Sequence, residues 1–158
     1  MPIDQVEFRA ALGRFASGVT IVTTKGSDES LHGLTVSAFS SVSLEPPLVL
    51  ISIEKSAGSH DALEQSRAFV VNVLSESQAP TSERFASHLQ DKFSGVGYSD
   101  GIDGIPVLDG CLVNLECRLF NSCDGGDHTI FIGEVESVSI KDGSPLVYFH
   151  GNYRVLTD

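Results

Sequence analysis

Basic residues are scarce in this sequence: ten lysines and arginines stand against 21 aspartates and glutamates, which gives a formal net charge of −11. So acidic a chain argues against nucleic acid as a partner, because phosphate contacts need a basic surface. Any anionic ligand would have to be held by local donors against an unfavourable overall field.

Long apolar runs are also absent. The most hydrophobic windows are interrupted within about ten residues, far short of a membrane-spanning helix, so we expect no membrane association. No basic start is followed by an apolar stretch, so the sequence predicts no secretion signal. A hydrophobic content of 41% in 158 residues is typical of a globular protein, and we expect one domain over residues 1–158.

Cysteine is rare, and its number is odd. Three cysteines argue against a disulfide framework and favour a reducing, cytoplasmic location. They recur every six residues, but on a strand Cys111 and Cys117 would lie roughly 20 Å apart, too far to share one ion. The five histidines also lack metal-type spacing, so we expect no metal and assign the cysteines to packing.

Short runs of β-branched and apolar residues recur along the chain and predict strands at residues 19–24, 31–36, 48–53, 68–74, 111–120, 129–140 and 145–149. Helical spacing and capping residues predict helices over 4–16, 59–66 and 79–89. Many short strands with few helices favour a mainly β, antiparallel barrel over a βαβ sheet. The glycine-rich stretch 91–106 is predicted to be a long loop.

Alternation within residues 111–120 predicts which side chains face the core. Cys111, Cys117 and the apolar residues at every second position should point inward, and Asn114, Glu116 and Arg118 outward.

One segment breaks the strand pattern. Residues 32–50, HGLTVSAFSSVSLEPPLVL, place four serines and two prolines between apolar runs. Serines compete with ladder hydrogen bonds, and small side chains would let a flat heteroaromatic ligand lie directly against the main chain. The same composition fits a twisted edge strand with solvent-facing serines. Composition alone leaves both interpretations open.

The usual catalytic and nucleotide motifs are missing. Neither a G-x-G-x-x-G turn between strand and helix nor a Walker loop is present, and there is no G-x-S-x-G elbow. The many serines and the histidines leave a hydrolase formally possible.

Several segments together resemble one family. FRAALGRFASGVTIVTT, the serine-rich segment, FVVNVL, GDHTIFIGEV and PLVYFHGNY are similar, in order over roughly residues 7–156, to the flavin reductase family of the split-barrel flavin-binding fold. More narrowly, they resemble the small NAD(P)H:flavin reductase component of two-component flavin-dependent monooxygenases.

This resemblance implies a Greek-key split β-barrel with a few flanking helices, which forms a homodimer and holds FMN or FAD in a groove beside the subunit interface. NADH or NADPH would be the co-substrate and would pass hydride from nicotinamide C4 to flavin N5. The reduced flavin would then diffuse to a partner monooxygenase. Such chemistry belongs to the cofactors, so the protein has to supply only proximity, orientation and electrostatics.

The resemblance also implies binding residues. The segment along the isoalloxazine ring matches Thr35, Val36, Ser37 and Ala38, and positions that reach the ribityl chain or phosphate match Ser41 and Val42. The phosphate contacts match Lys55, Ser59, His60, Phe85, Ala86, Ser87 and His88. Ser59 would open a helix whose free N–H groups favour an anion. Lys55 would add local charge, although a solvated surface lysine is the alternative.

His128, in the sequence GDHT, matches the family histidine that lies over the flavin near the nicotinamide. The resemblance implies that it orients the nicotinamide or donates a hydrogen bond as a catalytic residue; taken alone, it would be a structural histidine at a strand end. Gly151 and Tyr153, in HGNY, match the nicotinamide side, with an ordinary core position as the alternative for Tyr153.

Other functions remain open at this stage. The same fold carries different chemistry in corrinoid reductases and pyridoxamine-phosphate-oxidase-like enzymes, and a flavin-binding barrel without turnover would be a carrier or sensor. A purely structural barrel would bind no flavin. The choices between FMN and FAD and between NADH and NADPH are open as well.

Overall fold

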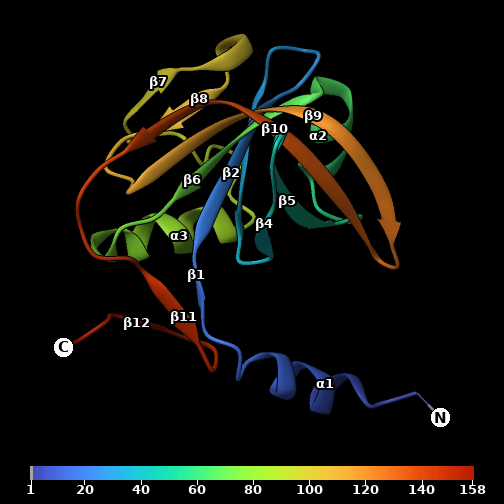
Figure 1. The fold of residues 1–158 in the computed structure, drawn as a ribbon, viewed down its shortest axis with the longest axis vertical. Helices are drawn as coiled ribbons and strands as arrows, with labels where there is room; N and C mark the ends of the chain where they lie inside the picture. Colours follow the sequence, from blue (N-terminus) through green and yellow to red (C-terminus); the bar gives the residue numbers. More distant parts are fainter. Residues whose placement is uncertain (1) are drawn as a thin grey trace.

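The computed structural model describes residues 2–158. Its centre is a seven-stranded antiparallel sheet in the order β3-β2-β6-β9-β10-β5-β4 (Figure 1). These strands are β2 (Thr20–Lys25), β3 (Leu31–Val36), β4 (Phe39–Leu44), β5 (Pro47–Glu54), β6 (Ala68–Val73), β9 (Val113–Gly125) and β10 (His128–Ile140).

The two outermost strands of this sheet, β3 and β4, are consecutive in the chain. Only Ser37 and Ala38 separate them, so the sheet has to curl until its first and last strands meet at this joint. The Ala38 carbonyl accepts a 3.0 Å hydrogen bond from the amide of Ser52 on β5, which fastens the joint to the next strand. The predicted mainly β, antiparallel barrel is confirmed, and its seam lies at Ser37–Ala38.

The barrel is filled by side chains from strands on opposite walls. Val22, Ile51, Phe69 and Phe131 are at most 1% exposed and pack in one cluster. Cys117 lies in the same cluster, and burial raises the pKa of its thiol to about 12. Cys111 is buried in a second cluster, so Cys111 and Cys117 have the packing role that the sequence predicted. Cys123 is exposed, so the same assignment was wrong for it.

Three helices flank the barrel: α1 (Gln5–Leu12), α2 (His60–Ser66) and α3 (Ala79–Ala86). Helix α3 packs against β3 so closely that a Cβ on Gly33 would lie 2.6 Å from the Phe85 ring. Helix α1 extends away from the barrel and buries none of its residues (Figure 1). Across residues 2–158, the helices are all too short or too polar to cross a bilayer.

Smaller elements complete the chain. A three-stranded sheet forms below the barrel from β1 (Ser17–Gly18), β11 (Val147–Phe149) and β12 (Asn152–Arg154), and β7 (Tyr98–Asp100) pairs with β8 (Pro106–Leu108). Two single-turn helices, η1 (Glu76–Gln78) and η2 (Ile102–Gly104), lie beside them. The stretch predicted as a long loop therefore holds a short strand and a helical turn, since β7 and η2 both fall within residues 91–106.

Other details differ from the predictions. The helices predicted over 4–16 and 79–89 end earlier, at Leu12 and Ala86. Asn114, predicted to face solvent, is 5% exposed. Its amide donates to Asn72 Oδ1 at 2.8 Å and to the Leu108 carbonyl at 3.2 Å, so a buried polar network reverses the simple alternation.

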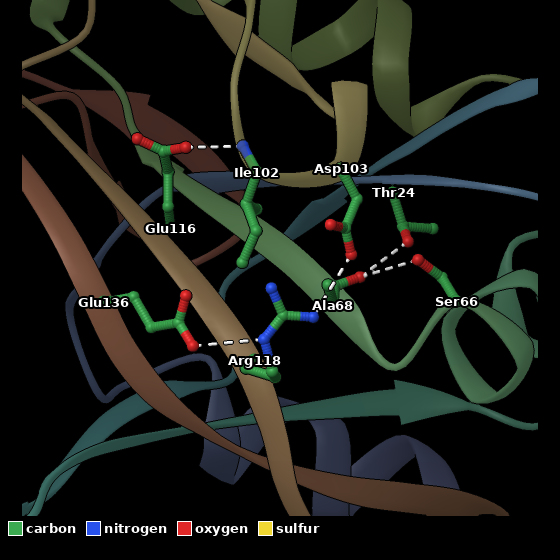
Figure 2. Close-up of polar contacts among 8 residues, drawn as sticks. All are labelled: Thr24, Ser66, Ala68, Ile102, Asp103, Glu116, Arg118 and Glu136. Atoms are coloured by element: carbon green, nitrogen blue, oxygen red, sulfur yellow. Dashed lines mark hydrogen bonds and ion pairs between the residues drawn. The ribbon is translucent and has the colours of Figure 1, made fainter.

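Figure 2 shows how the outer face of β9 holds the η2 turn. The carboxylate of Glu116 accepts a 2.6 Å hydrogen bond from the Ile102 amide, and Arg118 donates to Glu136 at 3.1 Å and to Asp103 at 3.2 Å. Arg118 thus joins two strands and the turn through half-exposed ion pairs. Such exposed pairs contribute little stability individually, and they fix the position of the turn.

Candidate functional site

A groove runs along β3 and consists of two connected parts. The inner pocket, about 230 Å³, is lined by residues 34–38, 52–54, 57 and 128. The outer lobe, about 970 Å³, is lined by residues 30–35, 54, 56–59 and 85–93. Four residues line both parts, Leu34, Thr35, Glu54 and Ala57, so the two parts form one continuous site.

The inner pocket combines the small residues Ser37 and Ala38 with larger side chains, Leu34, Ile53 and His128 among them. Ser37 and Ala38 are exposed, and within residues 2–158 their amide N–H groups donate to no protein acceptor. The Thr35 hydroxyl is used elsewhere, since it donates to the Ser82 carbonyl at 2.6 Å and ties β3 to α3. This pocket therefore offers backbone hydrogen-bond donors beside a flat, narrow space.

His128 closes the inner pocket at the start of β10. Its Nδ1 lies 2.7 Å from Asp127 Oδ1, and this hydrogen bond lowers the pKa of the Asp127 carboxyl below its usual value. Because an ionised carboxylate only accepts, Nδ1 carries the proton. The other ring nitrogen, Nε2, is left for a ligand in the pocket.

The serine-rich segment divides at the barrel seam. Residues 37–38 line the inner pocket, as the ligand interpretation predicts. Residues 39–44 form β4, an edge strand with a bulge between Ser41 and Ser43, as the edge-strand interpretation predicts. Ser41 and Val42 are exposed on β4 and line neither part of the groove.

The outer lobe gathers five of the residues predicted to contact phosphate: Ser59, Phe85, Ala86, Ser87 and His88. Ser59 precedes α2, and its side chain makes no capping hydrogen bond to that helix. The Ser87 hydroxyl donates to the Arg84 carbonyl at 2.6 Å and so closes the C-terminal end of α3. Phe85 is fully buried and forms the wall between the lobe and the core.

Lys55 and His60 lie outside the groove. The Lys55 ammonium pairs with Asp124 and donates to the Gly126 carbonyl at 2.8 Å, which holds the β9–β10 hairpin. His60 is 6% exposed, and its Nε2 lies 2.8 Å from the Thr129 hydroxyl. Its Nδ1 has no hydrogen-bond partner within residues 2–158.

Gly151 and Tyr153 also line neither part of the groove. Tyr153 lies behind it: the phenol is 2.6 Å from the Ser82 hydroxyl, and the Ser82 carbonyl accepts from Thr35. The C-terminal strand β12 is thereby connected to the inner pocket through α3.

Three charged groove residues, Glu54, Asp91 and Lys92, were not predicted from the sequence. Glu54 lies where the inner pocket meets the outer lobe, and Lys92 lines the lobe. Lys92 sits in the stretch that was predicted to be a loop, where sequence gives no contact partner. The one signal in the sequence that could have indicated Lys92 is that a lysine stands in a glycine-rich stretch of a strongly acidic chain.

The groove fits a flavin on its own chemistry. Ser37 and Ala38, whose amides are unpaired, line the inner pocket, and a lobe lined by Lys92 continues from it. A three-ring heterocycle with a polar edge and a phosphorylated tail needs hydrogen-bond donors beside the ring and a cation farther along the groove, beside the tail. A split antiparallel barrel with such a groove defines a class of flavin-binding proteins.

Comparison with known proteins gives the family. Residues 12–157 match the family described as "Flavin reductase like domain", and the chain belongs to this family. It is 42% identical over 158 residues to an NADH-dependent flavin reductase of a Rhodococcus species, covering 98% of this chain and 88% of that protein. It is 43% identical over 152 residues to HsaB, the reductase subunit of a flavin-dependent monooxygenase of Rhodococcus jostii RHA1, covering 96% and 77%.

Comparison with solved structures also finds flavin reductases. The Streptomyces globisporus C-1027 NADH:FAD oxidoreductase SgcE6, in complex with NAD and FAD fragments, superimposes with a TM-score of 0.93 at 38% identity, covering 98% of this chain and 93% of that chain.

Proposed function

We propose that this protein is an NADH-dependent flavin reductase that supplies reduced flavin to a partner monooxygenase. The observation that carries the proposal is the inner pocket, where the bare main chain of Ser37–Ala38 and the ring of His128 line the same narrow space. The NADH-dependent reductase and the monooxygenase subunit among its relatives support it.

Bound flavin would supply the chemistry by accepting a hydride from the reduced nicotinamide. The residues of this chain bind and orient the reactants. The unpaired Ser37 and Ala38 amides would hold the polar edge of the ring, and β3 would form a wall beside it. His128, fixed by Asp127, would use Nε2 to orient the nicotinamide.

An anaerobic assay tests the proposed activity. Purified protein is mixed with FAD, FMN or riboflavin and with NADH or NADPH, and loss of the yellow flavin absorbance is followed. We expect rapid NADH-dependent bleaching with turnover of excess flavin. Flavin binding without bleaching would identify a carrier instead, and no binding would leave a structural barrel.

We further propose that the protein is a cytoplasmic homodimer that includes α1 in its interface. Helix α1 has no buried residue in the single chain; Phe8 and Leu12, one turn apart on it, are 48% and 57% exposed, and Phe15, just after the helix, is 82% exposed. An apolar helix face of this kind needs a partner surface. Light scattering of the purified protein should give twice the chain mass, and Phe15→Asp should shift it toward the monomer; a wild-type monomer would contradict the proposal.

A further inference from the structure

The ring of His60 is buried with one of its two nitrogens unsatisfied. The residue is 6% exposed, and its Nε2 lies 2.8 Å from the Thr129 hydroxyl on β10. Its Nδ1 is buried as well and has no hydrogen-bond partner within residues 2–158. A buried polar atom that has lost its water without gaining a partner destabilises the fold. A ligand at Nδ1 would remove this cost.

Two carboxylates lie around that nitrogen. Asp61 Oδ1 is 3.7 Å from His60 Nδ1, which is too far for a hydrogen bond. The ligand atoms of His60, Asp61 and Glu64 all lie within 4.8 Å of one another. Within residues 2–158, neither carboxylate forms an ion pair with a lysine or an arginine. One nitrogen and two carboxylates therefore meet at a point where no basic side chain balances their charge.

The helix explains why these three side chains meet. His60 and Glu64 are one turn apart on α2, at positions i and i+4, and Asp61 follows His60 directly. Two ligands at i and i+4 of a helix are a known chelating arrangement. Asp61 and Glu64 are exposed, so they are free to rotate and give an ion a path to Nδ1. Small rotations would bring the ligand atoms to the separation of about 3.4 Å that bonds of about 2.1 Å to a tetrahedral ion require.

The ring of His60 is already oriented for such a role. A histidine that binds a metal usually donates its other ring N–H to an oxygen, which fixes its tautomer and its direction. The buried Thr129 hydroxyl offers this oxygen to Nε2. The ring also packs against Phe131, with 5.6 Å between the ring centroids. These two contacts leave Nδ1 on the side of the carboxylates.

The ligand types indicate which ion would bind. Mg²⁺ and Ca²⁺ take oxygen ligands, whereas an imidazole nitrogen favours a borderline ion such as Zn²⁺. The net charge of −11 also attracts cations to the surface. The sequence prediction of no metal considered only the spacing among cysteines and among histidines. It could not detect a cluster that holds a single histidine.

We infer that His60, Asp61 and Glu64 form a zinc site on α2, with Nδ1 as the nitrogen ligand and a fourth tetrahedral position open to water. None of the three residues lines either part of the groove, so the inference does not rest on the proposed function. The ion would join the first turn of α2 to β10 through His60 and Thr129.

The cluster also has a structural interpretation. A carboxylate in the first turn of a helix, such as Asp61, interacts favourably with the helix dipole, and a rotated Asp61 would accept a hydrogen bond from a protonated Nδ1. Neither role involves an ion. Substitution of Asp61 would then change the stability of the protein, so the test has to measure zinc binding itself.

The test is a titration of the flavin-free full chain with Zn²⁺, in competition with a chromophoric zinc chelator. Every variant carries Cys123→Ser, because the exposed thiol of Cys123 would bind zinc independently. Asp61→Asn and Glu64→Gln each remove one charge at an exposed position with little change of shape. Glu83→Gln, at an exposed position on α3, removes the same charge elsewhere and is the matched control.

We expect one Zn²⁺ per chain at this site. Asp61→Asn and Glu64→Gln should each weaken it by at least ~10- to 100-fold, the range seen when even an outer partner of a ligand is lost. Glu83→Gln should bind zinc as the parent Cys123→Ser protein does, and a large excess of Mg²⁺ should not displace the zinc. In ¹⁵N NMR spectra of the histidine rings, Zn²⁺ should shift the Nδ1 resonance of His60.

Four results would overturn the inference. Absence of stoichiometric zinc binding means that Nδ1 is satisfied without an ion, and equal affinities in the parent, Asp61→Asn and Glu64→Gln place the zinc elsewhere. Weaker binding in these variants with unchanged His60 resonances identifies an acidic surface that attracts cations without the ring. Displacement by Mg²⁺ at a concentration comparable to that of zinc excludes a nitrogen ligand. Flavin reduction is measured separately, so each proposal can fail while the other stands.

Discussion

The inner pocket and the outer lobe use opposite means of recognition. The inner pocket presents the unpaired amides of Ser37 and Ala38. Two titratable residues line it: His128, from β10, and Glu54, where the pocket meets the lobe. The lobe presents side chains, including the Lys92 ammonium and several apolar groups. The inner pocket would therefore recognise a ligand by its shape and its hydrogen-bond acceptors, and the lobe would recognise it by its charge and size.

This difference separates catalysis from affinity. A hydride transfer depends on how closely the two rings approach, so it should respond to changes in the inner pocket. Cofactor choice depends on the groups attached beyond the ribityl chain, so it should respond to changes in the lobe. Variants at the two ends should therefore affect different measurements.

The largest effect should come from His128→Ala. Loss of a hydrogen bond to a charged or polarised group amounts to about 1.5–3 kcal/mol, or roughly 10- to 150-fold in rate. We expect the anaerobic rate constant for reduction by NADH to fall by this factor, measured by stopped flow, while the Kd of oxidised FAD changes less than about threefold.

His128→Gln is the informative companion, because its amide can still donate toward the ring and should recover part of the rate. Equal losses in rate and in flavin affinity would show that His128 merely supports the pocket wall. In that case the separation between the two ends of the groove would be lost.

A smaller effect is expected from Ser37→Val. The added methyl groups narrow the ring slot, and overpacking typically costs about 1–3 kcal/mol, so all three flavins should bind roughly tenfold more weakly. Ser40→Val, on the exposed face of the neighbouring edge strand, is the control and should bind flavin as wild type does. An unchanged titration of Ser37→Val would place the ring elsewhere.

The residues of the inner pocket were the part of the groove that the family resemblance implied together. Ser37, Ala38 and His128 lie in two short segments, a serine-rich break and a GDHT turn, and the structure brings them into one pocket; without the resemblance, the sequence left His128 as a structural histidine. The strands were predictable from local patterns, since β-branched runs such as β2 and β6 are buried along their length.

The lobe was less predictable because its contacts are not local. Lys92 meets the Gly33 carbonyl across 59 residues of sequence, and no periodicity reports such a contact. Lys55 was expected to add charge near the phosphate, but its ammonium pairs with Asp124 on the β9–β10 hairpin, outside the groove. Asn114 was misassigned for the same reason, because its partner Asn72 lies 42 residues away.

The smallest effect is expected from salt. With a net charge of −11, the protein repels both NADH and flavin phosphates at long range, and this repulsion is screened as ionic strength rises toward about 0.2 M. The KM for NADH should therefore hold or fall, by about twofold at most. Rate measurements at low and moderate salt give this slope. A steep rise in the KM for NADH would mean that a local cation, rather than the overall field, controls how the nicotinamide reaches the inner pocket.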